Sequence, residues 1–324
     1  MAGKKVAAGI DIGATNSVYG IVDRKGNILA EGAVKTAQYP HPGKFAETLF
    51  SNISAALGKF TSGSELAGIG IGVPMGNINK GTIEYPASLP WKGITPLAEL
   101  FSIYTTLPVI ITNDANAAAV GEMIYGGAKE MKDFVVLTLG TGLGSGFVVN
   151  GKLVYGNGGF AGELGHTAII PGYSDRECGC GKKGCTETYV SATGLKRTLF
   201  EIMARSIEPS PLRRISYEEI DAKIIYEAAV KGDPLALKAF DFTGMMLGVT
   251  CANVVAYTSP EAIFLFGGLT MAKDFIFAPA RRYMEENLLS IYRGKVKLLP
   301  SAIEEKNAAV LGASSLVWSQ LERS

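Results

Sequence analysis

Three of the four cysteines in this 324-residue chain, Cys178, Cys180 and Cys185, fall within eight consecutive positions. One of its two histidines, His166, precedes them. The glycines between the cysteines would let the backbone turn tightly around a single point. Three thiolates and one imidazole make a complete ligand set for tetrahedral zinc. The spacing therefore predicts a structural zinc site formed by these four residues.

Two other uses of the cysteines stay open at this stage. The C-x-x-C spacing of thiol-exchange motifs is absent, although a strained bond between Cys178 and Cys180 is compatible with the sequence. Inert thiols are the other alternative. Cys251 lies in a long apolar stretch, and we expect it to be a small buried apolar side chain.

Two glutamates, Glu163 and Glu187, lie close to these cysteines in the sequence. A carboxylate can accept hydrogen bonds from two neighbouring hydroxyl groups at once, which suits a sugar. The alternative is ordinary surface charge, because most glutamates are solvated.

A third carboxylate, Asp114, follows the apolar run 109–112 and precedes an alanine-rich stretch. An aspartate at the end of a strand can act as a general base towards a substrate hydroxyl, and Asn113 beside it can bind neighbouring hydroxyls. The alternative is that Asp114 is the N-cap of the following helix.

Two glycine-containing turns, "DIGATN" at 11–16 and "GTGLGSG" at 140–146, each lie between apolar runs. Gly13 and Gly142 are 129 positions apart, so the strand-turn-strand pattern repeats and predicts duplicated lobes. Such turns can cradle phosphate groups, and an aspartate beside one can hold Mg²⁺; turns without a ligand are the alternative. The candidate nucleotide-binding residues are Asp11, Gly13, Thr15, Asn16, Gly140, Thr141, Gly142, Gly144, Gly267 and Gly268.

The composition favours a small-molecule substrate. With 31 basic and 30 acidic residues, the net charge is +1, which gives no electrostatic reason to expect binding to nucleic acid or to an anionic membrane. The first apolar run breaks at Asp11, and no run reaches the roughly 18 apolar residues that a membrane helix needs. We therefore expect a cytoplasmic protein with neither a membrane nor a nucleic-acid partner.

Local signals place several elements. Asn150-Gly151 between apolar runs predicts a tight hairpin. Ser216 and Glu219 form a capping-box pattern that predicts a helix starting there, and Pro234 is expected in the first turn of a second helix.

Several motifs together resemble a known family. The order "DIGATN", "LGTGLGSG" and a late "FGG" resembles the superfamily of sugar kinases, heat-shock proteins and actin. Within it, "NDANAAAVGE", "GGFAGELGHT" and "CGCGKKGCTE" resemble the ROK group of bacterial sugar kinases and repressors, from about residue 6 to 320. The resemblance implies an α/β fold of two duplicated ribonuclease-H-like lobes. The smaller lobe would hold residues 1–113 and about 308–324, and the larger would hold 114–307 with the zinc loop and a helical insertion.

The resemblance also implies an activity. A ROK kinase would transfer the γ-phosphoryl group of ATP, with Mg²⁺, to the 6-hydroxyl of glucose or a related hexose, as a step of glycolysis. Asp114 would be the catalytic base, His166 would use one ring nitrogen for zinc and the other for the sugar, and a homodimer is the common state. The sugar-binding residues would be Asn113, Asp114, Glu163, His166 and Glu187.

The choice of sugar depends on pocket residues in the stretch 72–93, where Met75 departs from the usual G-x-P-G pattern. An N-acetylglucosamine, N-acetylmannosamine or fructose kinase is therefore the alternative. A sugar-responsive repressor is a further alternative, but such repressors carry a DNA-binding domain before the "DIG" motif, and only ten residues precede Asp11 here. A sugar-independent ATPase of the same superfamily would need neither the cysteine motif nor Asp114.

Overall fold

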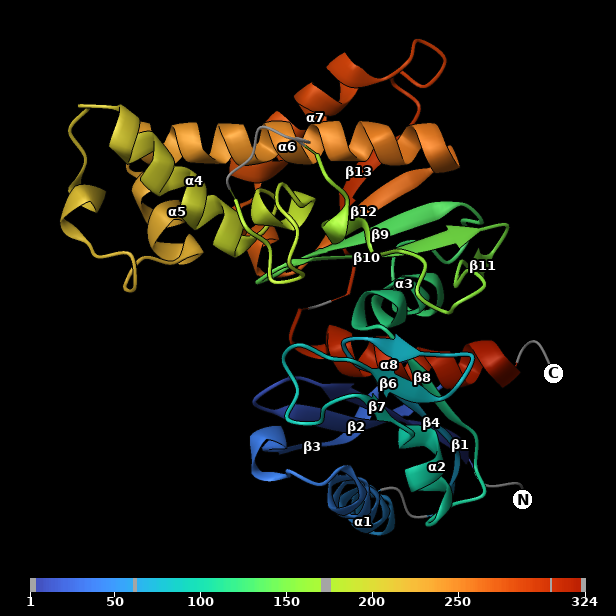
Figure 1. Cartoon of the computed structure of the whole chain (residues 1–324). Helices are drawn as coiled ribbons and strands as arrows, with labels where there is room; N and C mark the ends of the chain where they lie inside the picture. The colour runs from blue at the N-terminus through green and yellow to red at the C-terminus, as the bar shows by residue number, and fades with distance from the viewer. Residues whose placement is uncertain (1–3, 61–62, 170–175, 304, 322–324) are drawn as a thin grey trace. The chain divides into compact units, whose positions relative to one another are not determined.

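The computed structural model of the protein describes residues 4–60, 63–169, 176–303 and 305–321 (Figure 1). Contacts along the chain group it into two units. Unit 1 holds residues 1–131, 146–162 and 301–324, and unit 2 holds residues 132–145 and 163–300. The lobe boundary predicted after residue 113 stays a prediction.

Unit 1 is built on a five-stranded sheet with the order β3-β2-β1-β4-β8. Strands β1, β2 and β3 form antiparallel pairs, whereas β4 and β8 continue the sheet in parallel. The strands are β1 (Lys4–Ile12), β2 (Ser17–Asp23), β3 (Ile28–Val34), β4 (Ser64–Gly72) and β8 (Val109–Thr112).

Alternate residues of β1 face opposite sides of this sheet, as a strand requires. Val6, Ala8 and Ile10 belong to the apolar core that also contains residues of α1 (Pro42–Phe60) and α2 (Leu97–Ser102). The other face is covered by α3 (Asp114–Ile124) and α8 (Glu305–Leu321) (Figure 1).

The packing of α8 on the sheet is close enough to require glycine. A Cβ atom at Gly9 would collide with the Val310 carbonyl oxygen, and one at Gly70 would collide with the Ala313 carbonyl oxygen. The absence of a side chain at these two positions therefore lets the helix backbone approach the strands directly.

A second, small sheet in unit 1 has the order β5-β6-β7, with both pairs antiparallel. Its strands are β5 (Gly76–Asn77), β6 (Thr82–Glu84) and β7 (Ile94–Thr95). This sheet lies within the stretch 72–93 and just beyond it, the region predicted to select the sugar.

The second five-stranded sheet has the order β11-β10-β9-β12-β13. Its order repeats that of the first sheet, with β12 in parallel to both β9 and β13. The predicted duplication is therefore confirmed at the level of topology. The strands are β9 (Phe134–Leu139), β10 (Leu143–Val149), β11 (Lys152–Leu153), β12 (Ala262–Phe266) and β13 (Lys297–Pro300). The turn between β10 and β11 is formed by Asn150 and Gly151 at φ 52° and 70°, as their sequence predicts.

Four longer helices complete unit 2: α4 (Ala192–Arg205), α5 (Ala222–Val230), α6 (Pro234–Thr258) and α7 (Asp274–Asn287). Pro234 opens α6 as predicted, with Asp233 as its N-cap. The predicted helix start at Ser216 is wrong. Ser216 and Glu219 do bond to each other, but they close a turn, and α5 begins at Ala222 under the cap of Asp221.

Among the residues that the structure describes, one helix, α6, is long and apolar enough to cross a membrane by length and composition alone. Within unit 2, however, 67% of its most apolar window is buried, and it lies against α7 and α4 (Figure 1). Cys251 is fully buried in this helix, as expected. The apolar composition of α6 is thus accounted for by its place in a core.

Candidate active site

Two carboxylates meet at one edge of the first sheet. Asp11 pairs with Gly72 across β1 and β4, and Gly72 pairs with Thr112 across β4 and β8, so all three strands end at this edge. Asp114 follows at the start of α3. A Cβ atom on Gly72 would lie 3.5 Å from the Asp114 Cα atom and 3.8 Å from Asp11 Oδ1. The glycine therefore leaves the space between the two carboxylates open.

The N-cap of α3 is Asn113 and not Asp114, so the alternative interpretation of Asp114 as a helix cap does not hold. Asn113 has an extended backbone, and its Oδ1 accepts a hydrogen bond of 2.8 Å from the Ala115 amide, so Asn113 is the N-cap. Asp114 is the first helical residue, and its Oδ1 accepts from the same amide at 2.8 Å. The side chain of Asp114 remains accessible to solvent.

The surroundings raise the pKa values of both carboxyl groups. Desolvation, together with the negative charge of Asp114, raises the pKa of Asp11 from 3.8 to about 7. Desolvation by the surrounding protein also raises the pKa of Asp114, although water at its accessible surface limits the effect. Two carboxylates that repel each other in this way favour a bound cation or a shared proton.

The turn between β1 and β2 is tight. The Gly13 amide donates to the Asn16 carbonyl at 3.1 Å, and a Cβ atom on Gly13 would lie 2.8 Å from that carbonyl oxygen. The side chains of Thr15 and Asn16 are exposed. The turn therefore presents a hydroxyl and an amide to solvent next to Asp11.

The corresponding turn between β9 and β10 lies in unit 2. The Gly140 amide donates to the Gly142 carbonyl at 3.1 Å, Thr141 between them is exposed, and Gly144 is half-buried in β10. A Cβ atom on Gly142 would lie 2.5 Å from Glu187 Oε2. The turn and the Glu187 carboxylate are therefore in direct contact.

Two further glycines allow the β9–β10 turn to be packed this closely. Gly267 has a φ of 103°, and a Cβ atom there would lie 2.7 Å from the Leu139 carbonyl oxygen. Gly268 after it is exposed. A Cβ atom on Gly165 would collide with the Leu143 carbonyl oxygen. Gly165 was not among the predicted site residues, although its position between Glu163 and His166 was a signal for it.

The predicted zinc ligands lie together. One ligand atom from each of His166, Cys178, Cys180 and Cys185 lies within 4.8 Å of all the others. The Cys180 and Cys185 sulfurs are 3.7 Å apart, and Cys178 Sγ is 3.5 Å from His166 Nδ1. In a tetrahedral zinc site, bonds of about 2.0–2.3 Å place neighbouring ligand atoms about 3.4–3.8 Å apart. The donor set and its spacing thus fit zinc, and since all four cysteines are free, the alternative bond between Cys178 and Cys180 is not formed.

His166 faces a carboxylate with each of its ring nitrogens. Nδ1, the nitrogen near Cys178, is 3.7 Å from Glu187 Oε1, and Nε2 is 4.0 Å from Glu163 Oε2. The Cys178 thiol donates to Glu187 Oε1 at 3.0 Å. The imidazole therefore has Nδ1 on the side of Cys178 and Glu187 and Nε2 on the side of Glu163.

Arg176 holds this loop in place, a role that no pattern in the sequence predicts. Its buried guanidinium makes two bonds of 2.8 Å to Glu201 of α4 and donates at 2.7 Å to the carbonyl oxygen of Thr188. It also lies over the ring of Tyr189, 4.2 Å from the centroid. Arg176 thus ties the chain just before Cys178 to the residues just after Glu187.

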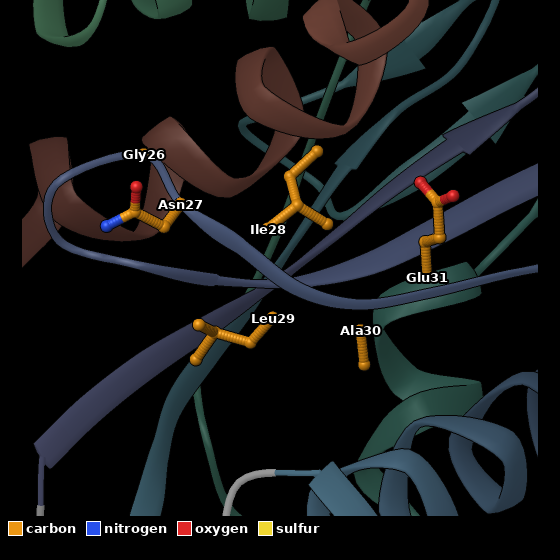
Figure 2. A pocket seen from close by; sticks show the side chains of 6 residues that line it. All are labelled: Gly26, Asn27, Ile28, Leu29, Ala30 and Glu31. Atoms are coloured by element: carbon orange, nitrogen blue, oxygen red, sulfur yellow. The ribbon is translucent and has the colours of Figure 1, made fainter.

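None of these residues lines a surface cavity of about 500 Å³ in unit 1. It is lined by Gly26–Glu31, the turn after β2 and the start of β3. Figure 2 shows the side chains of Ile28 and Glu31 on one side of the chain and those of Leu29 and Ala30 on the other, where the register of β2 and β3 shifts. The cavity contains neither titratable pairs nor any predicted site residue, so its size does not mark it as the active site.

Comparison with known proteins identifies the family. The ROK family model matches residues 7–320. A glucokinase of Halalkalibacterium halodurans is 34% identical over 86% of this chain and 84% of that enzyme. The xylose repressor of Bacillus subtilis is 31% identical over 78% of this chain and 61% of the repressor.

Among solved structures, the ROK glucokinase of Streptomyces griseus in complex with glucose and AMPPNP superimposes with a TM-score of 0.79 at 31% identity, covering 97% of this chain and 99% of that one. This similarity confirms the predicted α/β fold with two duplicated ribonuclease-H-like halves. With motifs, topology and comparisons in agreement, the chain belongs to the ROK family.

Proposed function

We propose that this protein is an ATP-dependent hexose kinase of the glucokinase type, acting on the 6-hydroxyl of glucose. The observation that carries the proposal is an accessible carboxylate, Asp114, at the end of a parallel strand and beside a second carboxylate, Asp11. A glucokinase relative and a ROK glucokinase structure with glucose and AMPPNP support it.

In the proposed reaction, Asp114 accepts the proton of the sugar hydroxyl. The hydroxyl oxygen forms a bond to the γ-phosphorus of ATP, and the bond from that phosphorus to the β–γ bridging oxygen breaks, which releases ADP. A raised pKa suits Asp114 to this role, because a base is most effective when its pKa approaches the working pH.

The sugar would be bound by Asn113, Glu163, His166 and Glu187. Carboxylates and a ring nitrogen can accept hydrogen bonds from neighbouring hydroxyls, and the Asn113 amide can both donate and accept. Both carboxylates lie within 4.0 Å of a His166 ring nitrogen, which supports a common role for the three side chains.

The nucleotide would be bound by the two glycine turns and the Gly267-Gly268 segment. Asp11 with Thr15 and Asn16 would serve one turn, and the backbone from Gly140 to Gly144 would serve the other. Mg²⁺ would fit beside Asp11, since a cation would offset the desolvation and the repulsion by Asp114 that raise the pKa of this carboxyl group. When bound, Mg²⁺ neutralises phosphate charge.

Zinc would be held by His166, Cys178, Cys180 and Cys185, and its contribution would be structural. With all four positions of a tetrahedron filled by protein atoms, such an ion has no place for a substrate water. The proposed role of these ligands is to fix the His166 ring in the orientation that sugar binding needs.

At the level of the whole protein, we propose a cytoplasmic homodimer that acts in glycolysis. We also propose that residues 1–113 and 308–324 move as one lobe and residues 114–307 as the other. Closure of such lobes would exclude water that would otherwise accept the phosphoryl group.

The experiment that tests the proposal is a substrate panel. The protein is assayed with Mg-ATP and glucose, mannose, fructose, allose, N-acetylglucosamine and N-acetylmannosamine, and the phosphate is located by NMR. Glucose should give the highest kcat/KM, with the phosphate on the 6-oxygen. A higher value for an N-acetylhexosamine or for fructose would reassign the substrate, and ADP release without any sugar would reject the kinase.

A further inference from the structure

A buried polar cluster in the small sheet of unit 1 has no part in the reaction described above. Asn77 of β5 is fully buried, and Glu84 of β6 is 7% exposed. Burying an amide and a carboxylate in this way is unfavourable unless every polar atom finds a partner. The cluster therefore marks a position where few arrangements of the chain give every buried polar atom a partner.

The Glu84 carboxylate is paired on several sides. Its Oε1 accepts hydrogen bonds from Asn77 Nδ2 at 3.1 Å and from Thr82 Oγ1 at 3.0 Å, and it forms an ion pair of 3.1 Å with Lys80. The hydrogen bond from Lys80 is the main reason that the pKa of Glu84 is lowered, so the group is ionised at neutral pH. An ionised Glu84 in turn requires a donor at Asn77, which fixes the orientation of the Asn77 amide.

The amide of Asn77 makes four hydrogen bonds. Its Oδ1 accepts from the amides of Asn79 and Lys80, at 3.0 and 3.3 Å. Its second Nδ2 bond, of 3.0 Å, goes to the carbonyl oxygen of Gly158, 81 residues further along the chain. Asn77 is therefore the link between the small sheet and a distant loop.

The loop at residues 156–162 is shaped to receive this link. Gly159 has φ 82°, and a Cβ atom there would lie 2.6 Å from Asn77 Oδ1, so only glycine fits against the amide. A hydrogen bond of 3.0 Å from the Ala161 amide to the Tyr155 carbonyl closes the loop on itself. Glu163 follows directly, and four residues from Gly159 can span at most about 14 Å.

The small sheet is itself held in an unusual conformation. Met75 and Tyr85, which flank β5 and β6, are not glycines but have φ values of 60° and 51°. Such residues persist only where the surrounding structure determines them, and they are concentrated at functional sites. Backbone bonds from Glu84 to Met75 and from Tyr85 to Gly93 hold them here, at 3.0 and 2.7 Å.

We propose that Asn77 is a positioning residue for sugar recognition, because its amide fastens the 156–162 loop to the small sheet and so sets the place of Glu163. The inference rests on the proposed function in one respect, the role of Glu163 in binding the sugar. Selection among sugars would then depend on how the 72–93 stretch holds this loop, as well as on which of its side chains touch the substrate.

The test reverses which side chain of the Asn77–Glu84 pair donates the hydrogen bond and which accepts it. In Asn77→Asp, the new carboxylate loses both donated bonds and repels Glu84 and the Gly158 carbonyl. Adding Glu84→Gln restores a donor to the pair but leaves the Gly158 carbonyl without one. Asn79→Asp is the matched control, because Asn79 is exposed and makes a longer bond of 3.3 Å to the same loop, at the Asn157 carbonyl.

Losing the tether should raise the KM for glucose about tenfold in Asn77→Asp, the change equivalent to one hydrogen bond, with the KM for ATP unchanged. The double variant should regain most of the melting temperature lost in Asn77→Asp but keep the raised KM. If the KM recovers with the melting temperature, or if Asn77→Asp leaves it unchanged, the proposal is overturned.

Hydrogen exchange separates this inference from the proposed function. Amides of residues 156–162 should exchange faster in both the single and the double variant than in the wild type, whichever sugar is turned over. Unchanged exchange would overturn the tether even in an active kinase. A wild-type protein without hexose kinase activity would refute the proposed function, and the exchange measurement would still decide whether Asn77 holds the loop.

Discussion

At the scale of single residues, carboxyl groups at opposite ends of the first sheet lie in contrasting environments. Asp11 and Asp114 share one sheet edge, where desolvation and mutual repulsion raise the pKa of Asp11. Asp23, at the far end of β2, is also buried, but hydrogen bonds from Asn27 and Lys4 outweigh the desolvation and lower its pKa. Burial alone therefore does not decide whether a carboxyl group is charged. The outcome depends on whether its neighbours repel the negative charge or donate hydrogen bonds to it.

Asp114→Asn should lower kcat by about 10²–10⁴-fold, since the general base is removed while the size of the side chain is kept. Steady-state kinetics with glucose and Mg-ATP measure the change. Asp221→Asn is the matched control, because Asp221 also begins a helix and asparagine caps helices as well as aspartate does. Comparable activity in the two variants would remove Asp114 from the catalytic role.

Asp11→Asn should stabilise the folded protein at pH 8 but hardly at pH 4. Because the folded pKa of about 7 lies above the unfolded value of 3.8, ionisation of Asp11 opposes folding increasingly between these two pH values and fully above pH 7. The gain in free energy of unfolding at pH 8 should be on the order of 2 kcal/mol.

Urea unfolding at the two pH values measures this effect. Asp23→Asn should have the opposite sign, because its lowered pKa means that the ionised form stabilises the fold; this contribution is present at pH 8 and is lost as the pH falls below 4. An equal effect of Asp11→Asn at both pH values would show that its charge is not the cause.

At the scale of elements, the sequence predicted those strands and turns whose structure depends on neighbouring residues alone. The repeated strand-turn-strand pattern predicted both sheets, and Asn150-Gly151 predicted its own turn. The pattern at Ser216 failed because Asp221, nearer the apolar stretch, caps α5. The roles of Arg176 and Asn77 could not be predicted, since their partners, Glu201 and Gly158, are 25 and 81 residues away in sequence.

The candidate site shows the same division. The clustering of His166 with the three cysteines followed from residue types and spacing. The contact of Gly142 with Glu187 depends on how a turn and a short helix, η3 (Thr186–Thr188), pack together, which no local pattern encodes.

Gly142→Ala should weaken glucose binding with little change in the free energy of unfolding, because the new methyl group would meet only the far end of the flexible Glu187 side chain and would push the carboxylate aside. Gly140→Ala, in the same turn, is the matched control, since a Cβ atom there has no neighbouring atom within 4 Å. Calorimetric titration of glucose and thermal melts compare the two variants. Equal glucose affinity in both variants would show that the contact between the turn and Glu187 has no part in sugar binding.

At the scale of the whole molecule, each unit contributes a separate part of the proposed chemistry. Unit 1 carries Asp11 and Asp114, and unit 2 carries the β9–β10 turn, the cysteine cluster and Glu187. Zinc binding would therefore require residues of unit 2 alone.

Removal of zinc by a chelator should weaken glucose binding, because His166 would lose the ligand that orients its ring. Calorimetric titration of glucose without nucleotide or Mg²⁺ measures the change, and metal analysis should find one zinc per chain. Cys178→Ser should reproduce the loss, whereas Cys251→Ala, a buried cysteine outside the cluster, should keep the zinc. Unaltered glucose binding by a folded, zinc-free protein would contradict the proposed role.

The close packing of α8 on β1 and β4 has a consequence for the newly made chain. The last helix covers the face of strands near the N-terminus at Gly9 and Gly70, so this part of the sheet stays uncovered until translation reaches residue 321. At a synthesis rate of about 5–20 residues per second, residues 132–300 alone take roughly 10–30 s to translate. During that time this part of the sheet lacks the cover of α8, so the close packing at Gly9 and Gly70 can form only after the last helix is made.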